Sequence, residues 1–479
     1  MNVVLKGLEP TLVWEYFEKI AKIPRCSGKE EKICSYLISF AKKNKLSYKK
    51  DKVGNVLIKK NASVGKENSK TIILQAHVDM VCEKEPNIKF NFDKEPIQLR
   101  RNNDWLSAKG TTLGADNGIG VAMMLSVLSD NTLIHGPLEC LFTVSEETGL
   151  YGAKGLKKGV LFGGCLINLD FGDDKEFCIG SAGAEGFFIN KKITRIKSNK
   201  DMYLEISVSG LLGGHSGVDI NKNRGNSIKI ITRLLNEFKF NFEICSFDAG
   251  NKLNAIPRDA KVVIGIDKKD YDVVISAAKK IEIKSTKRVV FDKKLSFLIK
   301  TIARQKQVLS ENSKKELLSI LQSLPNGIIS MEKKMINCVE TSINLAKVSL
   351  SDNSLEIGLF ARSSNDEKLQ KLVSDVKVIV NKLGFEFIFD HSVPSWQPDI
   401  NSKLCKTMVS VYEDLYHSKP KIVSVHAGLE PGELLKKYPN LDCISVGPLM
   451  ENLHSPTERL SVSSTRWVYG LLVKTLEKL

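Results

Sequence analysis

Residues 71–80, TIILQAHVDM, decide the fold, because an apolar run of strand length ends there in a histidine and an aspartate. The same plan recurs in LECLFTVSEE (138–147) and CLINLD (165–170), where acidic residues follow apolar runs. A helix-forming stretch, VAMMLSVLSD (121–130), stands between the first two runs. This alternation predicts an α/β sheet whose strands place polar side chains at their carboxyl ends.

Five polar side chains stand at such junctions and form a candidate metal site: His77, Asp116 in GTTLGADNGIG, Glu147, Asp170 and His454 in ENLHSPTERL. Imidazole nitrogen and carboxylate oxygen are ligands of Zn²⁺ in hydrolytic sites, and two ions about 3.5–4 Å apart can hold one water between them. Taken singly, each residue has a simpler explanation as a packed histidine or a turn-forming aspartate. Their recurrence at strand ends, with the adjacent and mutually repelling acids Glu146 and Glu147, favours a cation site.

The longer strings resemble those of a known family. HVDMVCEK, GTTLGADNGIG, SEETGLYGAKGL, INLD, GGHSGVDI and HSPTER are similar to motifs of the M20 metallopeptidases, in particular the aminoacyl-histidine dipeptidases. The resemblance runs from the first predicted helix to the last. It implies a zinc-peptidase fold and hydrolysis of unblocked dipeptides, including Xaa-His dipeptides such as β-alanyl-histidine. Another M20 amidohydrolase, an N-acyl amino acid deacylase or an aminopeptidase, is the alternative.

The resemblance also implies a metal content and a ligand set. Two zinc ions per chain are expected, one held by His77 and Asp170 and the other by Glu147 and His454, with Asp116 bridging them. Mn²⁺ or Co²⁺ would suit the same nitrogen and oxygen ligands.

Two further acids, Asp79 and Glu146, are then catalytic. A carboxylate two residues beyond a ligating histidine can orient the imidazole, which is the role expected of Asp79. Glu146, next to a ligand, would take a proton from the attacking water and pass it to the leaving amine. The family usually has a cis peptide after the bridging aspartate, here the Asp116–Asn117 bond, which sequence alone does not reveal.

Five residues match family positions that contact the substrate. His215 in GGHSG would stabilise the oxyanion, although a loop histidine held by the backbone is the simpler reading. Asn254 and Arg362 would hold the carboxylate end of the substrate, which the Arg fork suits, with a surface salt bridge as the competing role of Arg362. His426 and Glu430 lie in the matching string VHAGLEPG, with Glu430 a candidate for binding the amino group.

Other interpretations stay open. Asn221, Asn223 and Pro431 depart from the family's usual strings, which puts the exact substrate in doubt but leaves the metal site untouched. A non-catalytic peptide-binding protein is a second class, but it would not need both Asp79 and Glu146. A basic nucleic-acid binder is a third class, which predicts steep salt dependence and no metal requirement.

The charge and composition bear on that third class. The net charge is +16, from 71 basic and 55 acidic residues, and the excess is lysine spread over segments such as 41–52 and 191–200. Because no nucleic-acid motif accompanies it and aromatic residues are only 7%, we expect a solvated surface and no specific nucleic-acid partner. No apolar run nears the ~20 residues that span a bilayer, and the first twenty residues lack the plan of a signal peptide. We therefore expect a cytoplasmic protein without membrane contact. Its ten cysteines form no CxxC pair, and we expect them to be reduced and mostly buried.

At 479 residues more than one domain is expected. Residues 1–186 and 393–479 are predicted to form one discontinuous, mixed-sheet α/β catalytic domain, because the strand pattern returns after SVPSWQPD and His454 must join the other ligands. Residues 187–392 contain two strand–helix–strand units, which predict an inserted α+β lid of two lobes. Such a lid would supply His215 within one chain or across a homodimer, and the sequence does not choose between them.

Overall fold

The computed structural model describes residues 3–289, 292, 294–333, 335 and 337–479. The chain forms two units. Unit 1 consists of Met1–Gly180, Trp396–Ser424 and Leu429–Leu479, and unit 2 of Ser181–Ser395 and Val425–Gly428. The sequence places the first boundary at residue 187 and the second at residue 393, and nothing in its pattern assigns the short segment 425–428 to unit 2.

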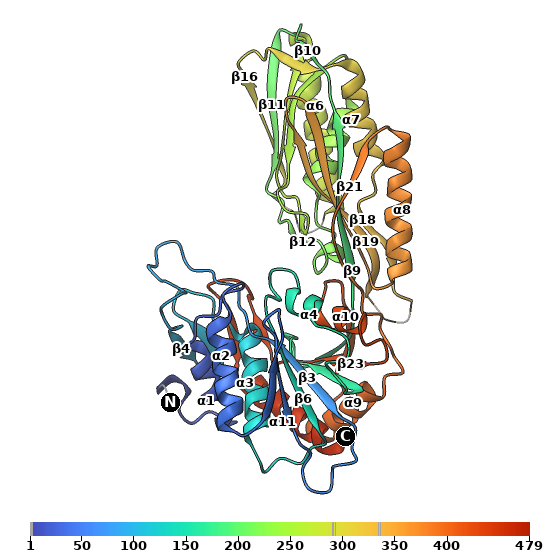
Figure 1. Ribbon diagram of the computed structural model, residues 1–479. Coiled ribbons are helices and arrows are strands. Elements are labelled where there is room, and N and C mark those ends of the chain that lie inside the picture. The colour runs from blue at the N-terminus through green and yellow to red at the C-terminus, as the bar shows by residue number, and fades with distance from the viewer. Residues whose placement is uncertain (1–2, 290–291, 293, 334, 336) are drawn as a thin grey trace. The chain divides into compact units, whose positions relative to one another are not determined.

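Unit 1 is built on the sheet that carries the polar strand ends. Within the described residues its strands follow the order β1 (Ser47–Lys50), β2 (Val56–Lys60), β6 (Leu138–Thr143), β3 (Ile72–His77), β7 (Cys165–Asn168), β23 (Asp442–Ser445), β8 (Glu176–Ser181) and β22 (Lys421–Val425). β3 is parallel to both of its neighbours, β6 and β7. Every residue of β3 and β6 is buried, as expected of central strands covered on both faces. The carboxyl ends of these three strands therefore lie at one edge of the sheet (Figure 1).

Unit 1 contains seven α-helices among the described residues. They are α1 (Thr11–Ala21), α2 (Glu31–Lys43), α3 (Ala115–Ser129), α4 (Tyr151–Gly155), α9 (Lys403–Tyr416), α10 (Glu430–Leu435) and α11 (Val462–Lys478), with the 3-10 helix η1 (Val3–Leu5). Of these, α1, α2, α3, α9 and α11 share one hydrophobic core with the sheet, while α4 and α10 contact each other. A smaller sheet follows the order β24 (Met450–Glu451), β25 (Arg459–Ser461), β5 (Trp105–Ala108) and β4 (Leu99–Asn102). Because β25 pairs with β5, the segment that contains His454 returns to the first part of the chain.

Unit 2 contains a second sheet, which over the described part of the chain follows the order β16 (Ser296–Ile302), β11 (Met202–Ser209), β15 (Ala260–Ile266), β13 (Glu243–Ala249), β19 (Val339–Leu350), β20 (Ser354–Ser363), β9 (Gly183–Lys192) and β21 (Glu386–Val393), with β18 (Gly327–Met331) paired to β19. The two predicted strand–helix–strand units meet where β13 pairs with β19, so they share one continuous sheet. Two short ribbons join β10 (Arg195–Lys197) to β17 (Gln307–Leu309) and β12 (Gly214–His215) to β14 (Ala255–Ile256).

The helices of unit 2 are α5 (Ser227–Glu237), α6 (Tyr271–Arg288), α7 (Glu311–Ser323) and α8 (Asp366–Lys382), with the 3-10 helices η2 (Ile220–Lys222) and η3 (Lys268–Asp270). The start of α5 shows how the sequence sets them: the Asn226 side chain accepts a hydrogen bond from Lys229 N at 3.2 Å, which caps the helix. Ile228, Ile231 and Leu235 then recur at helical spacing and are buried in the core of unit 2.

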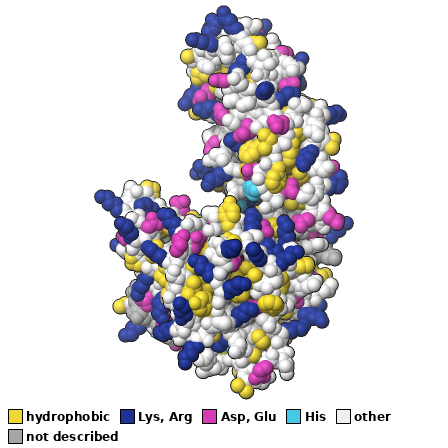
Figure 2. Space-filling model, viewed as in Figure 1, with side chains coloured by type: hydrophobic (Ala, Val, Ile, Leu, Met, Phe, Trp, Pro, Cys, Tyr) yellow, Lys and Arg dark blue, Asp and Glu magenta, His cyan; other side chains and the backbone are white. Residues whose placement is uncertain are grey.

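The surface carries charges of both signs. Figure 2 shows Lys and Arg side chains scattered over the visible face, with Asp and Glu among them. No helix in the described ranges combines the length and apolarity needed to cross a bilayer.

The cysteine prediction needs a correction. Cys26 and Cys82 form a disulfide, with 5.7 Å between their Cα atoms, a normal spacing for this bond. The two residues are 56 positions apart in sequence and meet because Cys26 forms an isolated parallel bridge with Met80. No short spacing between cysteines in the sequence predicts this contact. The expectation that all ten cysteines are reduced is wrong for this pair.

The other cysteines should stay reduced. Six of the eight are buried, and burial raises the pKa of the Cys34 thiol to about 11 and that of Cys245 to about 12, which suppresses the reactive thiolate. We expect eight thiols per chain when protein purified without reductant is denatured and titrated with Ellman's reagent, and ten after reduction. Ten thiols before reduction would contradict the Cys26–Cys82 pairing.

Candidate active site

The strand ends of unit 1 bring the predicted ligands together. His77 is the last residue of β3, Glu147 follows β6, and Asp170 follows β7, so all three project from the same edge of the sheet. Asp116 lies in the first turn of α3, which packs against β3. This is the placement of ligands at the carboxyl ends of parallel strands that the sequence predicts.

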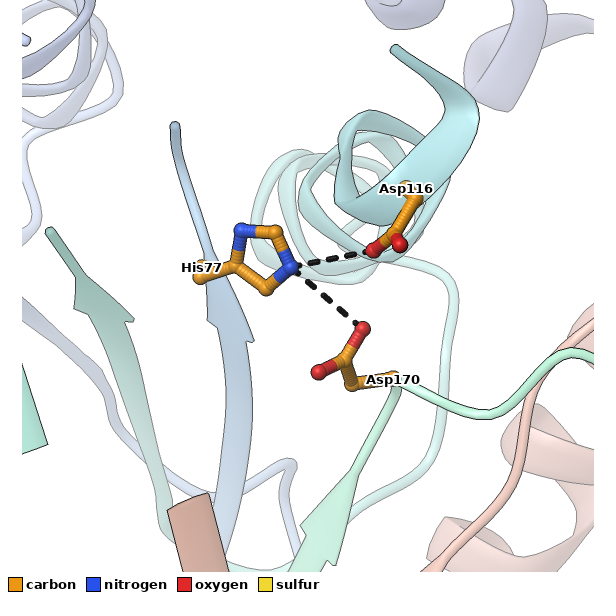
Figure 3. A group of neighbouring side chains, drawn as sticks. All are labelled: His77, Asp116 and Asp170. Atoms are coloured by element: carbon orange, nitrogen blue, oxygen red, sulfur yellow. Dashed lines mark hydrogen bonds and ion pairs between the residues drawn. The ribbon is translucent and has the colours of Figure 1, made fainter. Parts of the chain in front are cut away.

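One group of ligand atoms surrounds His77. Its Nε2 lies 3.0 Å from Asp116 Oδ1 and 3.4 Å from Asp170 Oδ1, and all three side chains point toward one another (Figure 3). Ligand atoms of these three residues lie within 4.8 Å of one another, close enough to bind one ion.

A second group surrounds His454. Its Nε2 lies 3.0 Å from Glu147 Oε2 and 3.2 Å from Asp116 Oδ2. The two oxygens of Asp116 therefore face two different imidazoles, an arrangement compatible with the predicted bridge between two ions. His454 adopts a left-handed backbone conformation with φ of 60°, uncommon for a residue other than glycine.

Asp79 ties the first group to the turn after β6. Its Oδ1 lies 3.3 Å from His77 Nδ1 and accepts a hydrogen bond of 3.0 Å from Glu146 N, while its Oδ2 accepts one of 3.2 Å from Glu147 N. A carboxylate so placed can orient the imidazole. Glu146 itself can share a cation with His77 and Glu147, since their ligand atoms lie within 4.8 Å of one another.

The crowding of acids shifts their protonation. Burial and the repulsion of Asp170, Glu147 and Glu430 raise the pKa of Glu146 well above its usual range. Burial also raises the pKa of Asp170 to about 6. The pKa values of the two imidazoles are raised as well, which favours their charged form.

Hydrogen bonds to Asp116 and Glu147 raise the pKa of His454 to about 11. Burial disfavours the charged form of His77, but Asp170 and hydrogen bonds to its carboxylate neighbours raise the pKa of that imidazole well above its usual value. Both rings thus tend to be protonated wherever no cation takes their place.

The donor set fits divalent cations. Two imidazoles and the carboxylates of Asp116, Glu147 and Asp170 are the nitrogen and oxygen donors that zinc takes. Among the described residues Glu147 Oε1 is buried without a hydrogen-bond partner, a costly state that a cation would relieve.

Several supporting residues were not predicted. Ser27 Oγ donates to Asp79 Oδ2 at 2.7 Å, and Glu30 Oε1 accepts from Ser145 N at 3.0 Å and so holds the turn that leads into Glu146. Arg25 and Glu458 also contact the backbone of this site. Glu458 lies within the quoted string HSPTER, which was the available signal for it, whereas Arg25 in PRCSG lies outside the quoted strings. The Asp116–Asn117 peptide is cis.

Glu430 is buried against β3 and β6, the two strands that lead to His77 and Glu147. It is 0% exposed, and its Oε2 accepts hydrogen bonds from Gln75 Nε2 and, at 2.8 Å, from Thr143 Oγ1. Burial raises the pKa of Glu430 to about 7. Its Oε1 is buried without a hydrogen-bond partner among the described residues, and the binding of the substrate's amino group by Glu430 stays a prediction.

The remaining predicted residues gather in unit 2. His215 Nε2 lies 3.2 Å from Arg362 Nη2, and the Asn254 carbonyl accepts a hydrogen bond of 2.8 Å from the N–H of Ser216. His426 Nε2 lies 2.8 Å from Ser342 Oγ, and burial with nearby Arg362 lowers the pKa of His426 to about 3.

Arg362 is not on the surface. It is 4% exposed, and no carboxylate of the described chain pairs with it. The surface salt bridge that the sequence left open is therefore absent from the described residues.

Known proteins resemble the chain over nearly its whole length. Residues 73–478 match the family model described as peptidase family M20/M25/M40. The cytosol non-specific dipeptidase of Escherichia coli (strain K12) is 36% identical over 99% of both chains. The crystal structure of aminoacylhistidine dipeptidase from Vibrio alginolyticus has a TM-score of 0.90 and 33% identity, over 99% of this chain and 98% of that one. A tripeptidase from Staphylococcus aureus, with a TM-score of 0.56 and 15% identity over 98% of both chains, shares the fold.

Cation binding should release protons. Since His454 has a pKa of about 11 and a cation binds only the neutral imidazole, binding at pH 7 must displace its proton. We expect Zn²⁺ affinity of the chelator-treated protein to rise with pH between 6 and 8, about tenfold per unit for each proton released. Calorimetry in buffers of different ionisation enthalpy measures the proton count.

His454→Asn is the test variant and His417→Asn its control. Both histidines have a left-handed backbone conformation that Asn tolerates, and His417 is exposed and lies outside the site. His454→Asn should release about one proton fewer than the native protein, whereas His417→Asn should not differ from it. Equal proton release by the native protein and His454→Asn would show that this ring does not bind the cation.

Proposed function

Because the chain belongs to peptidase family M20/M25/M40 and is a metal-dependent hydrolase, we propose that it hydrolyses unblocked dipeptides, Xaa-His dipeptides such as β-alanyl-histidine among them. The names of its two full-length relatives, a non-specific dipeptidase and an aminoacylhistidine dipeptidase, support this substrate class. The word cytosol in the name of the Escherichia coli relative supports a cytoplasmic location for this chain.

The observation that carries the proposal is the position of Asp116 between two imidazoles. With one carboxylate oxygen 3.0 Å from His77 and the other 3.2 Å from His454, this side chain suits two ions, one with His77 and Asp170 and one with Glu147 and His454. We propose zinc as the metal, with Mn²⁺ or Co²⁺ as substitutes. When bound, such a pair polarises the peptide carbonyl and lowers the pKa of a shared water to about 7.

Glu146 is the proposed general base and acid. Its raised pKa suits a group that must first accept a proton from the attacking water and then return it to the leaving amine. Asp79 keeps the necessary geometry, because the backbone N–H of Glu146 and the His77 ring both contact its carboxylate.

The geometry around His215 supports recognition of an oxygen anion. The N–H groups of Gly217 and Val218 donate to His215 Nδ1 at 3.2 and 3.1 Å, which places the proton of the neutral ring on Nε2. His215 Nε2 and Arg362 Nη2, 3.2 Å apart, are then both donors. We propose that His215 stabilises the oxyanion and that Arg362, with Asn254 and His426 nearby, binds the substrate carboxylate.

Hydrolysis of β-Ala-His and Ala-His, followed by liquid chromatography, tests the function. Purified enzyme is assayed as prepared, after chelation and after addition of Zn²⁺, beside N-acetyl-alanine and alanine p-nitroanilide. Metal-restored cleavage of the dipeptides supports the proposal. Cleavage of only the acylated or blocked compounds would instead indicate the deacylase or aminopeptidase alternative.

Removing the proposed base should slow turnover strongly without affecting metal binding. We expect Glu146→Gln to lower kcat by about 10²–10⁴-fold, the usual contribution of a positioned acid or base, because Gln keeps the shape of the side chain but does not accept the proton. Mass spectrometry should still find two metal ions per chain. The control is Glu176→Gln, which removes an acid paired with Lys421 on the surface, and activity should be native there. A Glu146→Gln enzyme with native kcat would exclude this role.

Arg362 should set the preference for a free carboxylate. In Arg362→Gln we expect kcat/KM for Ala-Ala to fall by about 10–150-fold, since a hydrogen bond to a charged group contributes roughly 1.5–3 kcal/mol, with little change for Ala-Ala-amide. Folding should not suffer, because a buried guanidinium without a carboxylate partner costs stability. Arg258→Gln, which removes an exposed arginine of the same unit, is the control. An equal loss with both substrates would contradict carboxylate recognition.

A further inference from the structure

The loop that carries Asp116 is held by a carboxylate from the far end of the chain. Glu458 Oε2 accepts hydrogen bonds from Leu113 N at 2.7 Å and Gly114 N at 2.9 Å. Its Oε1 accepts from Ala115 N at 2.8 Å and Asp116 N at 3.3 Å. One side chain thus satisfies four successive backbone N–H groups, and the last of them belongs to the residue between the two imidazoles.

Glu458 is itself firmly placed. It is 2% exposed, and it lies directly before β25, which pairs with β5. Its own N–H donates to the Ser455 carbonyl at 3.0 Å, so it belongs to the same short turn as His454. The turn therefore supplies both an imidazole that faces Asp116 and the carboxylate that holds the backbone of Asp116.

Arg25 holds the same loop from another side. Its Nη1 donates to the carbonyls of Val78 at 3.0 Å and Asp79 at 2.9 Å, and its Nη2 donates to the Gly114 carbonyl. The guanidinium, 3% exposed, therefore links the end of β3 to the Asp116 loop. Because three carbonyls share its planar fork, their relative positions are fixed.

Two glycines of the motif GTTLGADNGIG make room for Arg25. A Cβ at Gly114 would lie 2.5 Å from Arg25 Nη2, and a Cβ at Gly118 would lie 2.6 Å from it. Gly114 also has a φ of 69°, in the left-handed region. Gly114 and Gly118 are thus explained by the side chain of Arg25, far earlier in the sequence, and Gly114 also by the conformation of the turn.

We propose that Glu458 and Arg25 are positioning residues that hold Asp116 between His77 and His454, so that the two cation sites share one carboxylate at the correct spacing. The proposal deepens the function proposed above and rests on it. Neither side chain touches the reacting atoms. Their contacts are to backbone groups, and residues that orient metal ligands in this way typically change metal affinity or activity by about 10–100-fold when they are replaced.

The decisive variant is Glu458→Gln, which keeps the size of the side chain but leaves one acceptor oxygen and turns an NH₂ group toward backbone donors. We expect Zn²⁺ affinity, measured by competition with a chelating dye, to weaken by about 10–100-fold. In the metal-saturated enzyme kcat should fall over a similar range with KM nearly unchanged. Arg25→Lys should show the same pattern, because an ammonium does not reproduce the planar fork.

Matched controls separate positioning from general stability. Glu451→Gln removes a partly exposed acid that pairs with Arg459 on the neighbouring strand, and it should leave metal affinity native. Glu458→Asp keeps the charge on a shorter side chain and should restore part of the affinity lost in Glu458→Gln. If Glu458→Gln does not fold, Glu458→Asp and Arg25→Lys give the same comparison of metal affinity with melting temperature.

The outcomes are distinct. Native Zn²⁺ affinity and kcat in both Glu458→Gln and Arg25→Lys, or a lower melting temperature alone, would overturn the proposal. Weaker metal binding in folded variants supports it. If the native enzyme cleaves no dipeptide, the proposed substrate is wrong, whereas the metal titration still decides whether Glu458 and Arg25 position Asp116.

Discussion

The burial of several carboxylates around two imidazoles at one edge of a sheet is the constraint on which this structure depends. Carboxylates this close repel one another when ionised, and their desolvation adds to the cost. The raised pKa values of Glu146 and Asp170 are the direct expression of that cost. Only compensating positive charge or hydrogen-bond donors make such a cluster tolerable in a folded chain, and the cluster obtains both from residues far apart in sequence.

The fold distributes this compensation among different elements. Parallel strands β3, β6 and β7 bring their carboxyl ends to one edge, while Arg25 joins the end of β3 to the Asp116 loop. Asp79 receives two backbone N–H groups and Glu458 receives four, so backbone dipoles neutralise charge that side chains do not. Asp79 thereby holds the backbone of Glu146 and Glu147, and Glu458 holds the backbone of Asp116.

The residues at strand ends could be predicted from the sequence, whereas Arg25 and Glu458, which hold the backbone of the site, were not predicted. His77, Glu147 and Asp170 stand directly after apolar runs, so strand periodicity and known motifs sufficed to place them together. Partners whose contacts are to the backbone, such as Glu458 and Arg25, leave no pairwise pattern in a sequence. The same holds for Cys26 and Cys82, which meet through a single bridge across 56 positions. The burial of Glu430 depends on Gln75 and Thr143 from two different strands, and a matching motif says nothing about which way a carboxylate faces.

Unit 2 presents the opposite electrostatic problem. Arg362 is a buried cation without a carboxylate among the described residues, and the lowered pKa of His426 keeps a second positive charge from forming beside it. One unpaired cation with neighbouring donors is suited to a single anionic group, whereas the acidic cluster of unit 1 is suited to cations. In the function proposed above, Arg362 and His215 of unit 2 contact the substrate, whereas the metal ligands and Glu146 belong to unit 1. The departures from family strings at Asn221 and Asn223 fall in unit 2, in and beside η2, whereas Pro431 lies in α10 of unit 1. None of the three is among the five predicted metal ligands. Under the proposed roles, these departures bear on substrate preference and not on the predicted metal ligands.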